Sequence, residues 1–328
     1  MTPFELDRRR LLGACAAGAA LALAGNVRAA TWPERTVTVI VPYAPGGQGD
    51  VFARLVGDRL ARALGQSVIV DNRPGATGAL GARLVARAPA DGHLLLLGQT
   101  GEIAINGTAM KNPGYDALKD LRPVALVGNA PLVLAVPSGS PFQSVADLVK
   151  GARDAPGRVA YASSGTATPG HLAAAALAAG TGTEMTHVPY KGAGQAITDL
   201  IGAQVQFFFA SASSIVPHLQ GGRVRALAVS TPARLAGLPQ VPPVADTLPG
   251  FDFSLWGGYF APRATPEDIV RRLSEEINRI IVTPDLKARF EAEGSAVSPM
   301  TPERFEQFVR AEVAKYARLI KATGTILD

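Results

Sequence analysis

The stretch 37-VTVIVPYAPGGQGDVFARLVGDRLARAL-64 contains the structural unit that recurs along the whole chain. Its first five residues are mostly β-branched, which predicts a strand over residues 37–41. Glycines and prolines follow, and from Val51 to Leu64 the apolar residues recur at helical spacing. A strand that leads through a glycine-rich loop into a helix is the building unit of an α/β protein.

Similar units follow this one. A helix is expected over residues 80–88. Helix-compatible segments separate most of the further strands that we predict, at residues 67–70, 93–97, 159–163, 185–188, 205–209 and 226–229. This alternation predicts mostly parallel sheets that helices cover on both faces. The chain then becomes helical, with helices expected over residues 265–282, after Pro284 and from Thr301 onward.

Capping residues mark several of the expected helix starts. Ser144 is followed three residues later by an acid, in the manner of a capping box. Thr265 and Thr301 each precede a proline, which suits a cap followed by the first helical position. The last helix carries apolar residues at helical spacing from Phe305 to Ile320, which predicts a face packed against the core.

The first thirty residues have the features of an export signal. A basic run ending at Arg10 precedes an apolar stretch over residues 11–25, and residues 27–29 supply a small-x-small cleavage pattern. The paired arginines before Leu-Leu are typical of a twin-arginine signal. The apolar run is shorter than the ~20 residues that a membrane span needs, which favours a cleaved signal over a membrane anchor.

Cleavage of this segment changes the chemistry that the chain can perform. The only cysteine, Cys15, lies within it, so cleavage after Ala29 removes disulfide and thiol chemistry. The segment carries a net charge of +2, and its loss lowers the net charge from +5 to +3. Because this excess is small and scattered, we expect no nucleic-acid partner.

Three glycine-rich loops follow expected strand ends, where ligands bind in open α/β sheets. They are 42-PYAPGGQGD-50, 71-DNRPGATGALG-81 and the segment over residues 163–170. Glycines let backbone N–H groups approach a ligand and form an anion-binding nest. The third loop enters an alanine-rich helix, whose N-terminus adds free N–H groups and a positive dipole end. Composition alone leaves two interpretations open: an anion cradle, or a loop with a helix cap.

Motifs for catalysis, nucleotides and metals are missing from the sequence. The glycines over residues 75–81 are spaced G-x-x-G-x-x-G, unlike the dinucleotide fingerprint, and neither a P-loop nor a G-x-S-x-G elbow occurs. No metal-ligand spacing joins the four histidines, His93, His171, His187 and His218. Of these, His171 is the best functional candidate because it begins the helix after the third loop. We therefore predict no catalytic set, no cofactor and no metal.

Short motifs occur in a fixed order along the chain. They are 42-PYAPGG-47 with Asp50, 70-VDNRPGA-76, 163-SSG-165, 187-HVPYKG-192, 222-GRVRALAV-229 and 256-WGG-258. Their succession resembles the periplasmic solute-binding proteins of tripartite tricarboxylate transporters, the Bug-type or TctC-like receptors. The resemblance covers essentially the whole chain after the export signal.

The resemblance implies the α/β fold of periplasmic binding proteins, similar to their type II. Each of two domains would hold a mostly parallel sheet flanked by helices, with the ligand in a closing cleft between them. We expect crossing segments near residues 130–134 and 253–257. The resulting boundaries are a signal peptide at 1–29, domain 1 at 30–131 and 257–328, and domain 2 at 132–256.

The resemblance also implies a site where backbone N–H groups and ordered waters hold a carboxylate. The domain 1 wall would consist of Tyr43, Ala44, Gly46, Gly47 and Asp50. The opposite helix N-terminus would bind the carboxylate through Ser163, Ser164, Gly165, Thr166, Thr168 and His171. The domain 2 wall would be completed by Tyr190, Lys191, Gly192, Phe209, Ala210 and Ser211. Alternative interpretations are that Asp50 caps a helix, Tyr43 packs against the sheet and Lys191 is solvated.

The sequence departs from the family in several informative places. Thr166-Ala167-Thr168 replaces the more usual glycine and serine pattern, and no acidic residue follows Val205, where the family commonly has one. The loop over residues 210–214 has no carboxylate, whereas a receptor for amino acids needs an acceptor for the ammonium group. Only Asp50 could serve, so we expect a carboxylic acid without an amino group.

The predicted function is that of a monomeric periplasmic protein that captures a small carboxylated organic ligand for the membrane subunits of a transporter. A sensing receptor without transport is an alternative. A second alternative is an exported enzyme with His171 or Asp50 as general base, although the sequence contains no recognisable nucleophile–base set.

Overall fold

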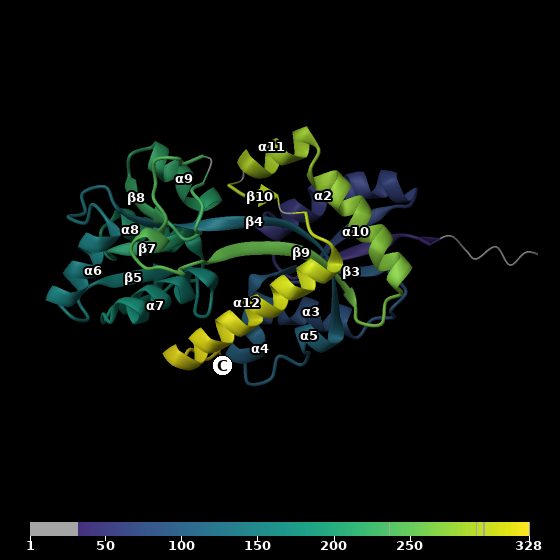
Figure 1. Ribbon diagram of the computed structural model, residues 1–328, viewed down its shortest axis with the longest axis horizontal. Coiled ribbons are helices and arrows are strands. Elements are labelled where there is room, and N and C mark those ends of the chain that lie inside the picture. The colour runs from purple at the N-terminus through teal and green to yellow at the C-terminus, as the bar shows by residue number, and fades with distance from the viewer. Residues whose placement is uncertain (1–31, 236, 293, 298, 328) are drawn as a thin grey trace, which may run out of the picture.

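The computed structural model describes residues 32–327, except for residues 236, 293 and 298 (Figure 1). The predicted signal peptide and Cys15 lie outside the described residues. No helix in the described part of the chain is both long and apolar enough to cross a membrane.

Strands and helices alternate through most of the chain. The first part consists of β1 (Val37–Val41), α2 (Gln48–Leu64), β2 (Val68–Asn72), η1 (Ala76–Gly78), α3 (Ala79–Ala86), β3 (Leu94–Gln99), η2 (Gly101–Ile105), α4 (Asn106–Ala109), α5 (Ala117–Asp120) and β4 (Leu121–Pro137). The middle part consists of α6 (Val145–Asp154), β5 (Ala160–Ser163), α7 (Pro169–Thr181), β6 (Thr186–Pro189), α8 (Ala193–Ile201), β7 (Phe207–Ser211), α9 (Ala212–Gln220), β8 (Val224–Val229) and η3 (Val244–Asp246). The last part consists of β9 (Ser254–Pro262), α10 (Glu267–Ile281), α11 (Pro284–Ala292), β10 (Ala296–Val297) and α12 (Pro302–Thr323).

The strands form one curled path in the order β2-β1-β3-β9-β4-β7-β5-β6, with β10 and β8 also paired to β4. Pairing is parallel among β1, β2 and β3, and again among β5, β6 and β7. Strands β4 and β9 pair antiparallel with all their neighbours. The α/β alternation is confirmed, but the sheet is mixed rather than mostly parallel.

Strand β4 lies inside this path and connects its two parallel units. Its first eleven residues pair with β9, from Leu121 opposite Pro262 to Pro131 opposite Ser254. From Leu132 onward it pairs with β7 and β8 instead. In Figure 1, β4 and β9 lie side by side and extend from the half that contains β3 to the half that contains β7. The two predicted crossing segments fall within or beside these strands, and the domain boundaries stay predictions.

Two of the three predicted helix caps are confirmed. The Ser144 side chain accepts a hydrogen bond from Asp147 N, and the Thr301 side chain accepts one from Arg304 N. The prediction for Thr265 is wrong, because α10 begins at Glu267 with Pro266 in the capping position. The Thr265 side chain is instead fully buried, and its N–H closes a turn onto Pro262 O.

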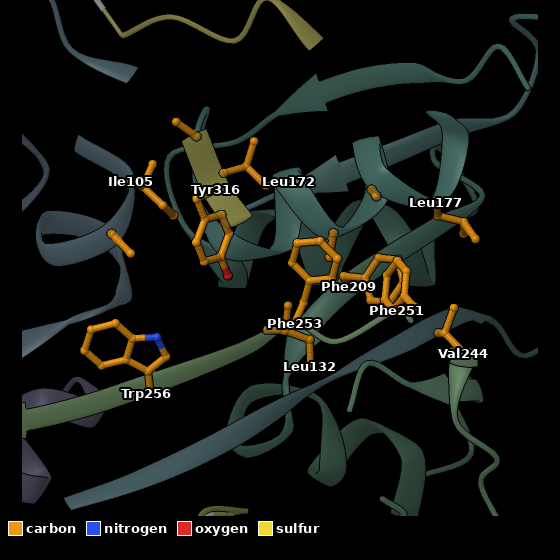
Figure 2. Close-up of a cluster of buried hydrophobic side chains, with 14 of the residues drawn as sticks. Ile105, Leu132, Leu172, Leu177, Phe209, Val244, Phe251, Phe253, Trp256 and Tyr316 are labelled. Carbon is orange, nitrogen blue, oxygen red and sulfur yellow. The ribbon is translucent and has the colours of Figure 1, made fainter. Parts of the chain in front are cut away.

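Helix α12 packs its apolar face against the core, as predicted. Phe305, Val309, Tyr316 and Ile320 are all buried. Figure 2 shows Tyr316 beside Leu172 of α7, in the same core cluster. A single helix therefore contacts both β4 and α7.

We predict that Gly258→Ala destabilises the fold. A Cβ at Gly258 would lie 2.5 Å from Phe305 Cζ and 2.8 Å from Ala125 O, so α12 or β4 would have to move. Overpacking of this kind costs about 1–3 kcal/mol. Urea unfolding followed by circular dichroism measures the loss. Gly139→Ala is the control because its Cβ would meet nothing within 4 Å; equal stability of the two variants would contradict the prediction.

Candidate ligand-binding site

A cavity of about 290 Å³ lies between the ends of β1 and β3 and the N-terminus of α7. Its lining residues come from three segments of the first half, from the loop before α7 and from two apolar positions late in the chain. They are Tyr43, Gly47, Gln48, Gly49, Thr77, Gln99, Thr100, Gly101, Asn106, Ser164, Thr166, Ala167, Thr168, Pro169, Leu255 and Leu327. None of these carries a charged side chain, so the wall offers hydroxyls, amides and backbone groups.

Five of the predicted site residues line this cavity: Tyr43, Gly47, Ser164, Thr166 and Thr168. Larger hollows of about 660 and 740 Å³ lie elsewhere, and no predicted site residue lines either of them. The smaller cavity is the candidate site because it lies at strand ends and at a helix N-terminus.

The loop before α7 turns polar groups toward the cavity. Thr168 is the N-cap of α7, and its hydroxyl donates to Gly165 O at 2.8 Å. The N–H groups of Ser164 and Thr166 have no hydrogen-bond partner among the described residues. Because the helix dipole adds positive potential at this end, the loop suits an anion.

A stacked pair of histidines, the buried His171 and the half-buried His187, supports this loop. The rings of His171 and His187 stack with centroids 3.8 Å apart and an interplanar angle of 14°. His171 Nδ1 accepts a hydrogen bond from Ala167 N at 3.0 Å, which fixes Ala167 at a left-handed φ of 57°. His187 Nε2 lies 2.7 Å from Ser163 Oγ. Both rings support the loop through its backbone and Ser163.

Burial favours the neutral form of both imidazoles. Desolvation, with a smaller contribution from His187, lowers the pKa of His171 to about 4. Desolvation also lowers the pKa of His187. A neutral ring leaves Nδ1 free to accept from Ala167, so the lowered pKa of His171 preserves the loop geometry at neutral pH.

The Ser163–His187 contact has the residue types of a nucleophile and a base, but Ser163 is fully buried. Its hydroxyl donates to Gly165 O at 3.0 Å and accepts from Gly165 N at 3.2 Å. A ligand in the cavity cannot reach it. Among the described residues no group of three His, Cys, Asp or Glu could hold a metal ion.

Asp50 supports the first loop from within the protein. Its carboxylate accepts from Gly46 N at 3.0 Å and forms an ion pair with Arg54 at 2.9 Å. Burial alone would raise the pKa of Asp50, but the hydrogen bonds from Arg54 and Gly46 outweigh it and lower the pKa. Asp50 lies in the first turn of α2 and does not cap it, because Gly47 is the N-cap.

The structure does not bring the remaining predicted residues to the cavity. Phe209 and Ala210 are buried in the core, and neither His171 nor Ser163, which are also buried, lines the cavity. The Tyr190 hydroxyl donates to Asp199 at 2.7 Å, and the Ser211 hydroxyl donates to Ser214 at 2.8 Å. The others outside the cavity lining are Ala44, Gly46, Asp50, Gly165, Lys191 and Gly192. Gly46 lines a separate hollow of about 270 Å³.

Glu102 is a buried carboxylate beside the cavity that the sequence patterns did not predict. It has no exposed surface, and it accepts hydrogen bonds from the Tyr43 hydroxyl at 2.8 Å and from Gln99 N at 2.5 Å. Burial raises the pKa of Glu102 to about 7, against the lowering effect of these hydrogen bonds. The stretch 99-QTGEIAI-105 matches no known motif; its one signal is an acid inside an apolar run directly after a strand.

A strained loop lies next to Glu102. Ala76 and Thr77 have left-handed φ values of 47° and 49°, which side chains other than glycine rarely adopt. Asn106 Nδ2 donates to Thr77 O at 2.9 Å and holds the strained peptide against the cavity.

Comparison with known sequences identifies relatives over nearly the whole chain. Residues 52–325 match the TctC family, described as the tripartite tricarboxylate transporter family receptor. The chain is 37% identical over 318 residues to the UPF0065 protein in the tcbD–tcbE intergenic region of Pseudomonas sp. strain P51, covering 96% of this chain and 94% of that protein. It is 34% identical over 307 residues to protein BugT of Bordetella pertussis, covering 93% of this chain and 94% of BugT.

Solved structures agree with this relationship. Rpa4515 of Rhodopseudomonas palustris, solved with adipate, superposes with a TM-score of 0.79 at 34% identity, covering 89% of this chain and 98% of that one. MatC of the same organism, solved with malate, has a TM-score of 0.76 at 31% identity, covering 88% and 100%. The α/β fold of periplasmic binding proteins is thereby confirmed. The chain belongs to the TctC family of tripartite tricarboxylate transporter receptors, which are solute-binding proteins rather than enzymes.

Proposed function

We propose that this receptor binds a small carboxylate-bearing organic molecule in the periplasm and delivers it to the membrane subunits of a tripartite tricarboxylate-type transporter. One observation carries the proposal: a cavity without charged lining residues that ends at the N-terminus of α7. Free N–H groups at Ser164 and Thr166, with nearby hydroxyls, are suitable donors for a carboxylate. Ordered waters can complete the hydrogen bonds that the wall does not supply directly.

The shape and chemistry of the cavity favour a compact acid without an amino group. A volume of about 290 Å³ suits a small organic acid, and Leu255, Leu327 and Pro169 offer apolar contact to its carbon chain. Asp50, the one acceptor that the sequence offered for an ammonium group, is already paired with Arg54. Adipate and malate, which the two structural relatives bind, belong to this class of ligand.

Closure around the ligand follows from the proposed domains. The residues that line the cavity come from both of the domains that the sequence predicts, and β4 and β9 extend across the predicted boundary. Ligand contacts that exist only when both walls are close would favour the closed form.

Mass spectrometry of small molecules released from freshly purified, denatured protein tests the proposal. Recovery of one organic acid in stoichiometric amount would support it, and recovery of an amino acid would contradict the ligand class. If the protein is empty, a thermal-shift screen of carboxylic acids replaces the first measurement; the absence of stabilisation by any acid would contradict the proposed function. A transport assay with the neighbouring membrane subunits would distinguish uptake from sensing.

We predict that Ser164→Leu weakens binding of the ligand at least ~10-fold while the fold stays intact. The larger side chain would occupy the cavity and shield the free N–H group of Ser164. Titration calorimetry measures the affinity. Thr198→Leu, on the exposed face of α8, is the matched control. Equal affinities of the two variants would remove Ser164 from the site.

We predict that His171→Phe also weakens ligand binding, although His171 does not line the cavity. The variant keeps an aromatic ring in the stack but removes the acceptor of Ala167 N, leaving a buried N–H unpaired at a cost of about 1–3 kcal/mol. The loop would then lose the geometry of its free donors. His218→Phe, on α9, is the control. A His171→Phe protein with unchanged affinity would show that the loop does not depend on this hydrogen bond.

A further inference from the structure

We propose that Glu102 is a proton-linked positioning residue, which takes up a proton from solvent when a carboxylate ligand binds and thereby releases the Tyr43 hydroxyl to the ligand. This inference rests on the proposed function of the same cavity. It concerns how the receptor accommodates a negative charge in a site that has no cationic side chain in its lining.

Tyr43 connects the buried carboxylate to the cavity. Tyr43, Thr77 and Gly101 line the cavity, and the Tyr43 hydroxyl donates to Glu102 Oε2 at 2.8 Å, with Thr77 O as a more distant acceptor at 3.4 Å. A Cβ at Gly101 would lie 2.8 Å from this hydroxyl, and one at Gly78 would lie 3.1 Å from it. The two glycines therefore leave the space that the hydroxyl occupies.

A hydroxyl has a single proton to donate. While Glu102 is ionised, the proton of Tyr43 is used by its carboxylate, and the oxygen of Tyr43 would face a ligand carboxylate as an acceptor. Once Glu102 is protonated, its own O–H can donate to Tyr43 Oη, and the Tyr43 proton becomes available to the ligand. The protonation state of Glu102 thus sets whether Tyr43 repels or binds an anion.

Few charges surround Glu102. Its own backbone carbonyl accepts from the Tyr115 hydroxyl, and the charge of Arg83 on α3 acts on Tyr115. The elements packed against η2 carry further titratable groups: Asp116, Lys119 and Asp120 at α5, and Glu312, Lys315 and Tyr316 on α12. The remaining titratable groups of α12 are exposed, except for the half-buried Glu306, which pairs with Arg263 and Arg310. Each of these two lysines pairs with an acid near or on its own helix. Among the described residues no cation forms an ion pair with the Glu102 carboxylate.

This environment makes the proton available near neutral pH. Burial raises the pKa of Glu102 to about 7 in the absence of ligand. A ligand carboxylate close to Tyr43 would raise the pKa further, because two like charges in a poorly solvated site disfavour each other. Binding then takes up a proton between the two pKa values. The affinity for the ligand is highest at a pH below the pKa that Glu102 has in the ligand-free protein. Above that pKa the affinity falls by up to about tenfold per pH unit.

Titration calorimetry with adipate and with malate tests the proposal in the mature protein. Both probes stay mostly ionised between about pH 6.5 and 8.5. We expect the dissociation constant to rise across this range, and the apparent binding enthalpy to vary with the protonation enthalpy of the buffer in the direction of proton uptake. Binding with a constant affinity and no proton uptake would overturn this inference and leave the proposed function intact.

The variant Glu102→Gln isolates the residue. Its neutral amide mimics the protonated acid, so the affinity should match that of the unaltered protein at low pH and stay constant up to pH about 8.5. Glu312→Gln is the matched control: Glu312 is also a buried carboxylate that accepts from an aromatic side chain, Trp256 Nε1 at 2.9 Å, and it does not line the cavity. That control should keep the full pH dependence.

Proton uptake that persists in Glu102→Gln would overturn the inference. If this variant fails to fold, uptake by the unaltered protein remains decisive, because its absence refutes the proposal. A protein that binds neither probe nor any acid recovered from it would contradict the proposed function, and the role of Glu102 would fall with it.

Discussion

The antiparallel pairing of β4 and β9 is the constraint on which the rest of the structure depends. These two strands hold the end of the parallel unit β1–β2–β3 and, through β4, the parallel unit β5–β6–β7 in one hydrogen-bonded path. Loops at the ends of both units can therefore face the same cavity. Helix α12 packs across the path and adds the aromatic contacts around Trp256 that keep it in place. The position of the site is a consequence of this central pair.

Sequence patterns predicted the local units better than the central pair. Local sequence predicted the strand at residues 37–41 and the helix caps at Ser144 and Thr301, because each of these features depends only on residues close by in the chain. Strand β4 contains Pro123 and Pro131, and its register shifts next to Pro123. Prolines argue against a central strand. The tertiary pairing of β4 overrides that local signal, and no local pattern could reveal it.

The site residues also divide into those that local composition predicts and those that only the tertiary fold reveals. Glycine and hydroxyl content marked the loops that contain Tyr43 and Ser164 as cavity walls, because composition determines which loops can offer backbone donors. It could not reveal which polar groups face inward. The position of His171 at a helix start predicts a ligand contact, whereas in the structure its ring accepts a hydrogen bond from Ala167 N and does not line the cavity. Glu102 could not be predicted as a site residue, because its link to the cavity is a contact with Tyr43 that only the folded structure shows.

A wall without charged side chains also affects how the receptor responds to salt. Ions in solution screen the attraction between opposite charges, but they act far less on short hydrogen bonds from backbone and hydroxyl donors inside a cavity. The described lining residues offer only such donors to the anion that we propose as the ligand. A receptor built in this way keeps its affinity for an organic acid when the ionic strength of its surroundings changes, and it gives up the long-range attraction that would speed capture in dilute media.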